Sequence, residues 1–157
     1  MIKLEKKESI YFLTMDAGEN RWNTTFVREI AKALDTIEDD EGPGALITSA
    51  TDSKFFSNGL DLDWMQAPED YPDGGDREVF GEEFMYLMGR FITLPIPTIC
   101  ALNGHTFGAG FMFALSHDFR IMREDRGFLC ANEMQLGLSI PRPELSLFKH
   151  KIPANAF

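Results

Sequence analysis

The amino-acid sequence predicts an α/β fold in which parallel strands are flanked by helices. Short apolar runs typical of strands alternate with longer amphipathic segments typical of helices. In the second half of the chain, strand, helix and strand alternate twice, which is the pattern of a parallel sheet covered by helices. The chain has 157 residues, of which 44% are hydrophobic and 25% charged, so it can bury the core of one ordinary domain.

The first half of the chain is predicted to form two strands, a helix and a third strand. Residues 2–6 and 9–15 read as strands that can pair as a hairpin. Thr24 or Thr25 is expected to cap a helix, because the apolar residues that follow recur at helical spacing. Glycine and proline at 42–44 end this helix, and a short buried strand follows at 45–49.

The second half of the chain continues the alternation. Helices are predicted at 78–91 and 111–117, and strands at 97–102, 119–122 and 127–131. The stretch 67–76 is rich in proline, glycine and acidic residues and is expected to be a surface loop. At the end of the chain, residues 145–148 begin like a helix that residues 149–153 interrupt. We therefore expect a single domain over 1–157 whose last helix is cut short.

Composition excludes several classes of function. The formal net charge of −10 argues against a nucleic-acid partner, because binding phosphates requires clustered lysine and arginine. No cysteine or histidine cluster predicts a metal site, and no apolar run approaches the length of a membrane span. The N-terminus has no apolar segment of the signal-peptide kind, so an intracellular protein is expected.

The most informative segment is the glycine-rich stretch at 103–110, NGHTFGAG. It follows an apolar strand-like run and precedes an apolar helix. A strand, a turn of small residues and a helix start together point backbone N–H groups at a negatively charged oxygen. Glycine also lets a ligand approach the main chain closely. The segment therefore predicts a site for an anion or an oxyanion.

Three segments, in order, resemble the crotonase superfamily of enoyl-CoA hydratases and isomerases. They are FFSNGLDL at 55–62, the glycine-rich turn at 103–110 with the ALSHD that follows at 114–118, and the stretch 127–138 that contains NEMQLGL. The resemblance implies a crotonase-like (ClpP/crotonase) spiral of ββα units with parallel sheets flanked by helices. It covers nearly all of this chain but only the N-terminal part of such an enzyme, so the family's C-terminal helices are expected to be missing. With them, the family implies a homo-oligomer, a trimer or a hexamer.

The resemblance also implies an acyl-CoA substrate and two backbone donors for its thioester oxygen. These donors map to Leu60 and Ala109, whose side chains need not take part. No cofactor is implied beyond coenzyme A as part of the substrate. The family's ligand-binding loop maps to 20–23, where Arg21 is expected to meet a phosphate and Trp22 the adenine or pantetheine. The remaining predicted substrate-binding residues are Asn58, Gly59, Leu62, Gly108 and Met112.

The acid and base residues predict which reaction the chain catalyses. The family's hydratases use two glutamates, and one of them maps to Met112, which argues against efficient hydration. The other maps to Glu133, in a setting that resembles the Δ3,Δ2-enoyl-CoA isomerases, which use a single glutamate there. One carboxylate can take a proton from C2 and return it to C4. Apolar neighbours, for which Phe128, Met112 and Leu136 are candidates, are expected to raise its pKa.

Four other polar residues are candidate catalysts. Glu144 is the rival base, although a carboxylate near a helix start is more often there to stabilise the helix terminus. Asp61 is read as a turn or cap residue. His105 lacks a serine or aspartate partner at a suggestive position, so a nucleophilic triad is not expected. His117 stands at a helix end, where a cation is favourable, and is assigned a structural role.

The sequence therefore predicts an enzyme that isomerises 3-enoyl-CoA to trans-2-enoyl-CoA in fatty-acid degradation, in the cytoplasm or the peroxisome. Two alternatives stay open at this point. The first is another crotonase reaction, either enoyl-CoA hydration or acyl-CoA hydrolysis. The second is a protein without catalytic activity that binds acyl-CoA or a partner.

Overall fold

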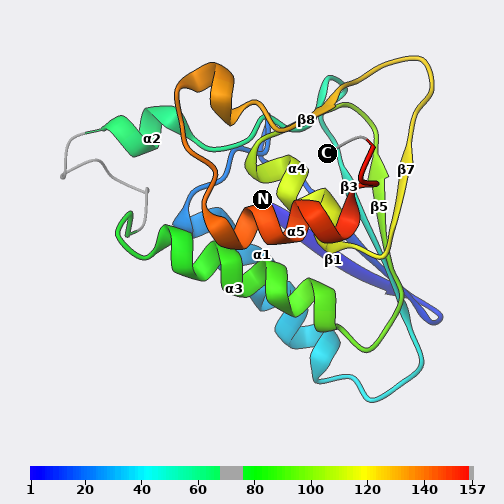
Figure 1. The fold of residues 1–157 in the computed structure, drawn as a ribbon. Helices are drawn as coiled ribbons and strands as arrows, with labels where there is room; N and C mark the ends of the chain where they lie inside the picture. The colour runs from blue at the N-terminus through cyan, green and yellow to red at the C-terminus, as the bar shows by residue number, and fades with distance from the viewer. Residues whose placement is uncertain (68–75, 156–157) are drawn as a thin grey trace.

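The computed structural model describes residues 1–67 and 76–155 and consists of strands flanked by helices (Figure 1). The strands are β1 (Ile2–Lys7), β2 (Ile10–Met15), β3 (Ala45–Ala50), β4 (Phe55–Ser57), β5 (Thr98–Leu102), β6 (His105–Phe107), β7 (Phe119–Met122) and β8 (Leu129–Cys130). The helices are α1 (Thr24–Glu38), α2 (Leu62–Gln66), α3 (Phe80–Thr93), α4 (Ala109–Ser116), α5 (Arg142–Lys151) and the short 3-10 helix η1 (Glu133–Leu136). Residues 68–75 of the predicted surface loop lie outside the described residues.

The strands form two sheets. The larger has the order β1-β2-β3-β5-β7, with β1 antiparallel to β2 and all other neighbours parallel. The smaller sheet, β4-β6-β8, is parallel throughout. The predicted hairpin and the parallel crossovers are thus confirmed. The strand expected at 127–131 is only two residues long, because it pairs with the short β6 in the smaller sheet.

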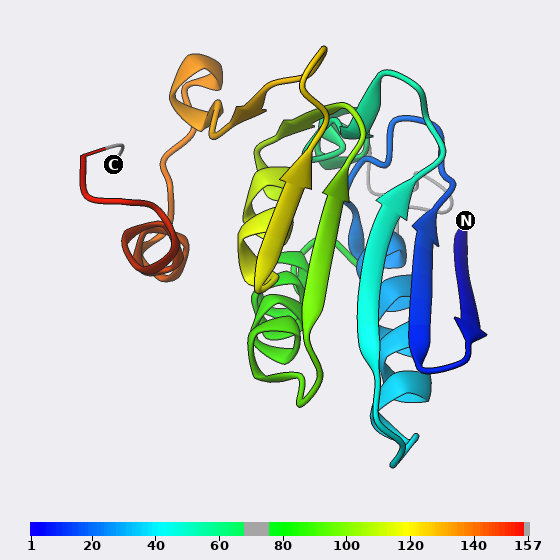
Figure 2. The ribbon, with the colours of Figure 1, turned by 90° about the vertical axis from the view of Figure 1, so that its right-hand side faces the viewer.

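Helices α1, α3 and α4 lie on one face of the larger sheet, and α5 stands beyond α4 (Figure 2). The apolar side of α1 is buried as its spacing predicted, but the cap is Asn23 rather than Thr24 or Thr25. The Asn23 side chain accepts a hydrogen bond from the amide of Phe26, which satisfies a donor left free at the helix start.

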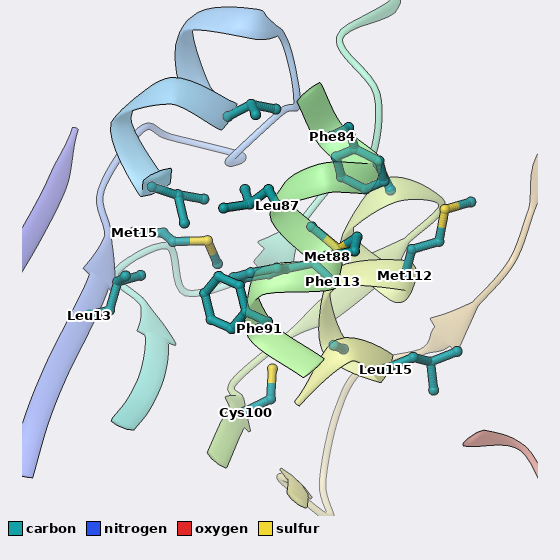
Figure 3. Close-up of a cluster of buried hydrophobic side chains, with 14 of the residues drawn as sticks. Leu13, Met15, Phe84, Leu87, Met88, Phe91, Cys100, Met112, Phe113 and Leu115 are labelled. Atoms are coloured by element: carbon teal, nitrogen blue, oxygen red, sulfur yellow. The ribbon is translucent and has the colours of Figure 1, made fainter. Parts of the chain in front are cut away.

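The core fills the space between the larger sheet and these helices (Figure 3). All eight residues of α4 are buried, which explains why its sequence is apolar on every side. Phe91 of α3 packs edge-on against Phe113 of α4, with ring centroids 4.8 Å apart. Because α4 is enclosed by its neighbours, the position of its N-terminus is fixed by the core.

His117 lies at the end of α4, fully buried between the helix and the sheet. Its ring nitrogens lie 2.9 Å from the carbonyl oxygen of Phe113 and 2.9 Å from the hydroxyl of Thr48. Burial lowers the pKa of His117 to about 4, so the ring is neutral at pH 7. The expected structural role fits these contacts, but the expectation of a cation at this helix end is wrong, because burial penalises the charge.

The buried neutral His117 makes folding sensitive to acid. Below pH 6.5 the unfolded chain takes up a proton that the folded chain refuses until about pH 4, so stability falls as pH falls through this window. We expect roughly 2–3 kcal/mol of unfolding free energy to be lost between pH 7 and pH 4.5 from this residue. Urea unfolding at the two pH values measures it. His117→Gln should lose less stability across the same interval, and equal losses in the two proteins would contradict this origin.

The C-terminal helix is longer than predicted. It begins at Arg142 and runs through the basic residues 149–151, where the sequence predicts an interruption. That expectation is wrong, because positive charges in the last turn of a helix interact favourably with the negative end of its dipole and stabilise the helix. Phe148 packs edge-on against Phe111 of α4, with ring centroids 5.1 Å apart, and holds α5 in place. No helix within the described residues has the length and apolar character needed to cross a membrane.

Candidate active site

A cavity of about 620 Å³ opens between the turns that follow β4 and β6, the start of α3, and the segment from η1 to α5. It brings together nine of the ten residues predicted for the site, with Trp22 as the exception. The nine are Arg21, Asn58, Gly59, Leu60, Leu62, Gly108, Ala109, Met112 and Glu133. Because β4 and β6 are parallel neighbours, the turns that follow them meet at the same edge of the smaller sheet.

Glycines let these two turns approach one another. Gly59 has φ +80°, and a β-carbon there would stand 3.0 Å from the carbonyl oxygen of Phe107. Gly108 has φ +48°, and its β-carbon would lie 3.2 Å from Oε1 of Glu133. A side chain at either position would be strained and would separate segments that now touch. The glycines thus place the main chain of both turns beside the carboxyl group of Glu133.

The amide of Leu60 is held by a short backbone bridge to the segment before α1. The N–H of Trp22 donates to the carbonyl of Gly59 at 2.8 Å, and the N–H of Asp61 donates to the carbonyl of Trp22 at 2.9 Å. In this pairing the amide of Leu60, which lies between Gly59 and Asp61, points away from Trp22. Asp61 accepts a hydrogen bond from the amide of Trp64 and caps α2, as predicted.

The amide of Ala109 is the first of α4. The first amides of a helix have no partner within the helix, and the N-terminal end carries a partial positive charge. Across residues 1–67 and 76–155, neither the Leu60 amide nor the Ala109 amide donates a hydrogen bond to backbone or side chain. Two of the residues that line the cavity, on two different turns, therefore carry N–H groups without a hydrogen-bond partner.

Trp22 does not line the cavity, and the predicted contact of its side chain with coenzyme A is wrong. Its ring is fully buried in the core, with the rings of Phe26, Phe84 and Phe113 at about 5 Å. Its indole N–H donates to the hydroxyl of Ser57 at 3.0 Å. A large apolar ring is more stable here than in water, and Trp22 reaches the site only through its backbone.

Arg21 does lie in the cavity wall, but its charge is already matched. Its guanidinium contacts Glu19 and Asp63, each at 2.8 Å. Glu19 also accepts a hydrogen bond from the side chain of Asn58 at 2.9 Å. These contacts raise the pKa of Arg21 and lower that of Glu19, chiefly through the hydrogen bonds. A phosphate would compete with the exposed Asp63 for this guanidinium.

Glu133 begins η1 and is 8% exposed. Its Oε2 atom is buried, and it has no hydrogen-bond partner in the described part of the chain. Burial raises the pKa of Glu133 above its ordinary value. Met112 and Leu136 line the cavity beside it, as expected. Phe128 does not contribute to the burial of Glu133, because it is 67% exposed and stacks on the ring of His105. The His105 ring accepts a hydrogen bond from the backbone amide of Phe128.

A further carboxyl group, that of Glu144, lines the same cavity from the first turn of α5. Burial and the negative charge of Glu133 raise the pKa of Glu144 to about 7. No side-chain hydrogen bond caps α5. The sequence analysis favoured a role for Glu144 in stabilising the helix start, whereas the structure places it in the site. No group of three or more potential metal ligands occurs among the residues that the structure describes.

The chain is similar to known proteins in both sequence and fold. Residues 5–155 match the model of the enoyl-CoA hydratase/isomerase family. The chain belongs to this family. Enoyl-CoA delta isomerase 2, peroxisomal, of Arabidopsis thaliana is 36% identical over 99% of this chain and 66% of its own length. Enoyl-CoA delta isomerase 3 of the same plant is 35% identical over 90% of this chain and 59% of its own length.

Solved structures of this enoyl-CoA hydratase/isomerase family have the same fold. An enoyl-CoA isomerase from Mycobacterium tuberculosis matches with a TM-score of 0.83 and 22% identity, over 98% of this chain and 64% of that one. The predicted crotonase-like fold is thereby confirmed. The chain spans about three-fifths to two-thirds of the length of the two Arabidopsis isomerases above, 66% and 59% respectively.

Part of the cavity of this family member was missed by the sequence analysis. Phe84 was expected only in the core, and it also lines the cavity, together with Phe80. Both residues lie on one side of α3. Their helical spacing predicts that this side is buried, but it does not predict whether it contacts the core or a cavity. Leu138 and Ser139 line the cavity from the segment between η1 and α5, where no residue pattern indicates a wall.

The raised pKa of Glu144 predicts a stability gain when its charge is removed. Above pH 4.5 the unfolded chain releases a proton that the folded chain holds until about pH 7, so stability falls as pH rises through this window. We expect Glu144→Gln to raise the unfolding free energy at pH 8 by on the order of 2 kcal/mol, after allowing for solvent screening. At pH 4 the two proteins should be equally stable. Denaturant titration at both pH values checks this, and a gain of equal size at pH 4 would contradict it.

Proposed function

We propose that the cavity isomerises 3-enoyl-CoA to trans-2-enoyl-CoA as a step of fatty-acid degradation. The observation that carries this proposal is the buried, unpartnered carboxyl group of Glu133 in the same cavity as the free amides of Leu60 and Ala109. The relatives named enoyl-CoA delta isomerases support the choice of reaction. Two of them are named peroxisomal, which supports the peroxisome as the place of this reaction.

In this proposal the two amides form an oxyanion hole for the thioester oxygen. Removing a proton from C2 gives an enolate, whose negative oxygen needs donors that are already in place. The amides of Leu60 and Ala109 are fixed by the backbone bridge and by the buried helix α4, so no reorganisation is needed. An oxyanion-hole donor typically contributes about 2.7–4 kcal/mol to lowering the barrier.

Glu133 is the proposed proton shuttle. As a carboxylate it takes a proton from C2, and the electron pair of that C–H bond moves into the enolate. In the simplest scheme it returns the same proton to C4, where the new C–H bond forms while the double bond moves to C2=C3. No water is consumed. The raised pKa of Glu133 makes it a stronger base than an ordinary carboxylate, and its burial limits access of water.

Substrate binding follows from the rest of the cavity wall. Phe80, Phe84 and Met112 offer an apolar surface to the acyl chain. Arg21 is proposed to contact a phosphate of coenzyme A, in exchange for its contact with Asp63. The backbone of Gly59, Leu62 and Gly108 borders the same ligand. Assembly into a trimer or hexamer stays a prediction, which light scattering of the purified protein measures.

The proposed function is tested by two parallel assays on the purified protein. One follows the absorbance of the conjugated thioester as 3-enoyl-CoA is converted, and the other follows its loss as 2-enoyl-CoA is hydrated. We expect fast conversion in the first assay and little change in the second, since Met112 lines the cavity at the position where the resemblance implies the other glutamate of a hydratase. Faster hydration, or release of free coenzyme A, would favour another reaction of the family. Binding without turnover would favour a protein that only binds acyl-CoA.

A further inference from the structure

Glu144 is a titratable group in the cavity that the proposed shuttle does not use. It reaches the cavity from the first turn of α5, in the same wall as Leu138 and Pro141. It is half-buried, and the negative charge of Glu133, which has the same sign, raises its pKa. Burying a carboxyl group beside another is unfavourable for the folded protein. The position of Glu144 therefore needs an explanation other than stability.

A role at the helix start does not supply that explanation. The helix is preceded by Pro141, which has no N–H for a capping box with the glutamate three residues later. Within the described ranges, the Glu144 side chain has no hydrogen bond or ion pair. The remaining benefit, attraction to the helix dipole, requires the charged form, which burial and Glu133 disfavour.

Glu133 and Glu144 are supplied by different elements and suit different carbons of the substrate. Oε1 of Glu133 would lie 3.2 Å from a β-carbon at Gly108, the residue before Ala109, whose amide is proposed to bind the thioester oxygen. C2 is bonded directly to the thioester carbon, whereas C4 is two carbons further along the acyl chain. A carboxyl group on the neighbouring helix can therefore serve C4 while Glu133 serves C2.

We infer that Glu144 is the acid that delivers a proton to C4, so that the cavity divides the two proton transfers between two carboxyl groups. This inference rests on the proposed isomerase function and refines its second step. It also explains why an uncompensated acid occupies the cavity wall.

The two proton transfers balance in atoms and in electrons. Glu133 starts as a carboxylate and takes the C2 proton, while the electron pair of that bond enters the dienolate. Glu144 starts as a neutral acid, and an electron pair of the dienolate forms the C4–H bond with its proton. The C2=C3 and carbonyl bonds form, and Glu144 is left as a carboxylate. After the product leaves, the proton on Glu133 passes to Glu144 and restores the starting state.

The charges around the cavity support this starting state. With its pKa raised to about 7, Glu144 holds a proton in slightly acidic to neutral solution. Among the residues that the structure describes, the other charged members of the cavity wall are Arg21, Asp63 and Glu133. Arg21 is paired with Glu19 and Asp63 and so does not neutralise Glu144.

The test is Glu144→Gln, assayed in ordinary water with a 3-enoyl-CoA that carries deuterium at C2. Glu133 is unchanged, so we expect deuterium to exchange out of C2 at least as fast as in the unmodified protein. Conversion to 2-enoyl-CoA should fall about 10²-fold, the usual contribution of a positioned acid. Glu144→Asp keeps an acid at this position and should restore part of the conversion.

Two further variants serve as controls. Glu82 is an exposed glutamate in the first turn of α3, so Glu82→Gln removes a charge from a helix start outside the cavity and should leave both rates unchanged. Glu133→Gln should lose exchange and conversion together.

The outcomes separate the two proposals. If Glu144→Gln converts substrate as fast as the unmodified protein, Glu133 alone carries the proton and the inference is wrong. If Glu144→Gln loses exchange and conversion equally, Glu144 acts through Glu133, which also overturns the inference. If the unmodified protein neither exchanges C2 deuterium nor isomerises the substrate, the proposed function itself fails.

Discussion

Replacement of Glu133 by glutamine is expected to lower kcat for isomerisation by about 10²–10⁴-fold. Glutamine has nearly the same shape, so the cavity and the packing around η1 should persist. Its amide cannot accept the C2 proton, and the enolate therefore cannot form by this route. The change is measured by the absorbance of the conjugated product, and calorimetric titration with a non-reacting acyl-CoA should show that binding is retained.

The pH dependence of the same reaction provides a second readout for Glu133. Because burial raises its pKa, the carboxylate form is lost at a higher pH than for an exposed glutamate. The rate should therefore decline on acidification at a pH above 4.5, the ordinary value, and the decline should be absent from the residual activity of Glu133→Gln. The matched control is Glu124→Gln, at an exposed position on the turn after β7. Undiminished turnover in Glu133→Gln would assign the C2 proton to another base.

Replacement of Gly110 by alanine is expected to cost about 3 kcal/mol of unfolding free energy and most of the activity. A β-carbon at this position would lie 2.5 Å from Cβ and 2.6 Å from Oγ of Ser57. The Ser57 hydroxyl donates to the carbonyl of Asn20 and accepts from the indole of Trp22, so it cannot move without breaking a buried network. Helix α4 must shift instead, and the amide of Ala109 shifts with it.

Chemical denaturation and the isomerase assay together measure this effect. The control is Gly89→Ala, inside α3, where a β-carbon meets nothing within 4 Å. Alanine there should stabilise the helix by about 0.5–1 kcal/mol and leave activity unchanged. A Gly110→Ala protein that is as stable and active as the unmodified one would contradict this prediction. It would show that α4 can move away from β4 without loss of stability or activity.

The local patterns of the sequence were sufficient for the fold and for most of the cavity. Gly59 and Gly108 interrupt strand-like runs, and both positions indeed adopt conformations that favour glycine. The apolar residues of α1 and α3 recur at helical spacing, and those faces are buried. Such features depend on neighbours within a few residues, so one sequence is enough to predict them.

The parts that failed depend on contacts between distant segments. Trp22 was expected at the ligand, but whether an aromatic ring faces a cavity or the core is decided by α3 and α4, far along the chain. Glu144 was ranked below Glu133 because its local context indicates only a helix start. Its place beside Glu133 results from the packing of Phe148 on Phe111, which no local pattern contains. The position of Phe128 on the surface follows in the same way from its stacking on His105.

The bridge between Trp22 and Leu60 has a consequence for how this scaffold can acquire new reactions. The spacing of the two proposed oxygen-binding amides is set by peptide groups and glycines, which side-chain replacement elsewhere in the pocket leaves untouched. Chemistry at the thioester can thus stay constant while substitutions at Met112, Leu138 or Glu144 redirect the fate of the same enolate. A designer seeking a different product from this chain would vary those three positions and leave the turns alone.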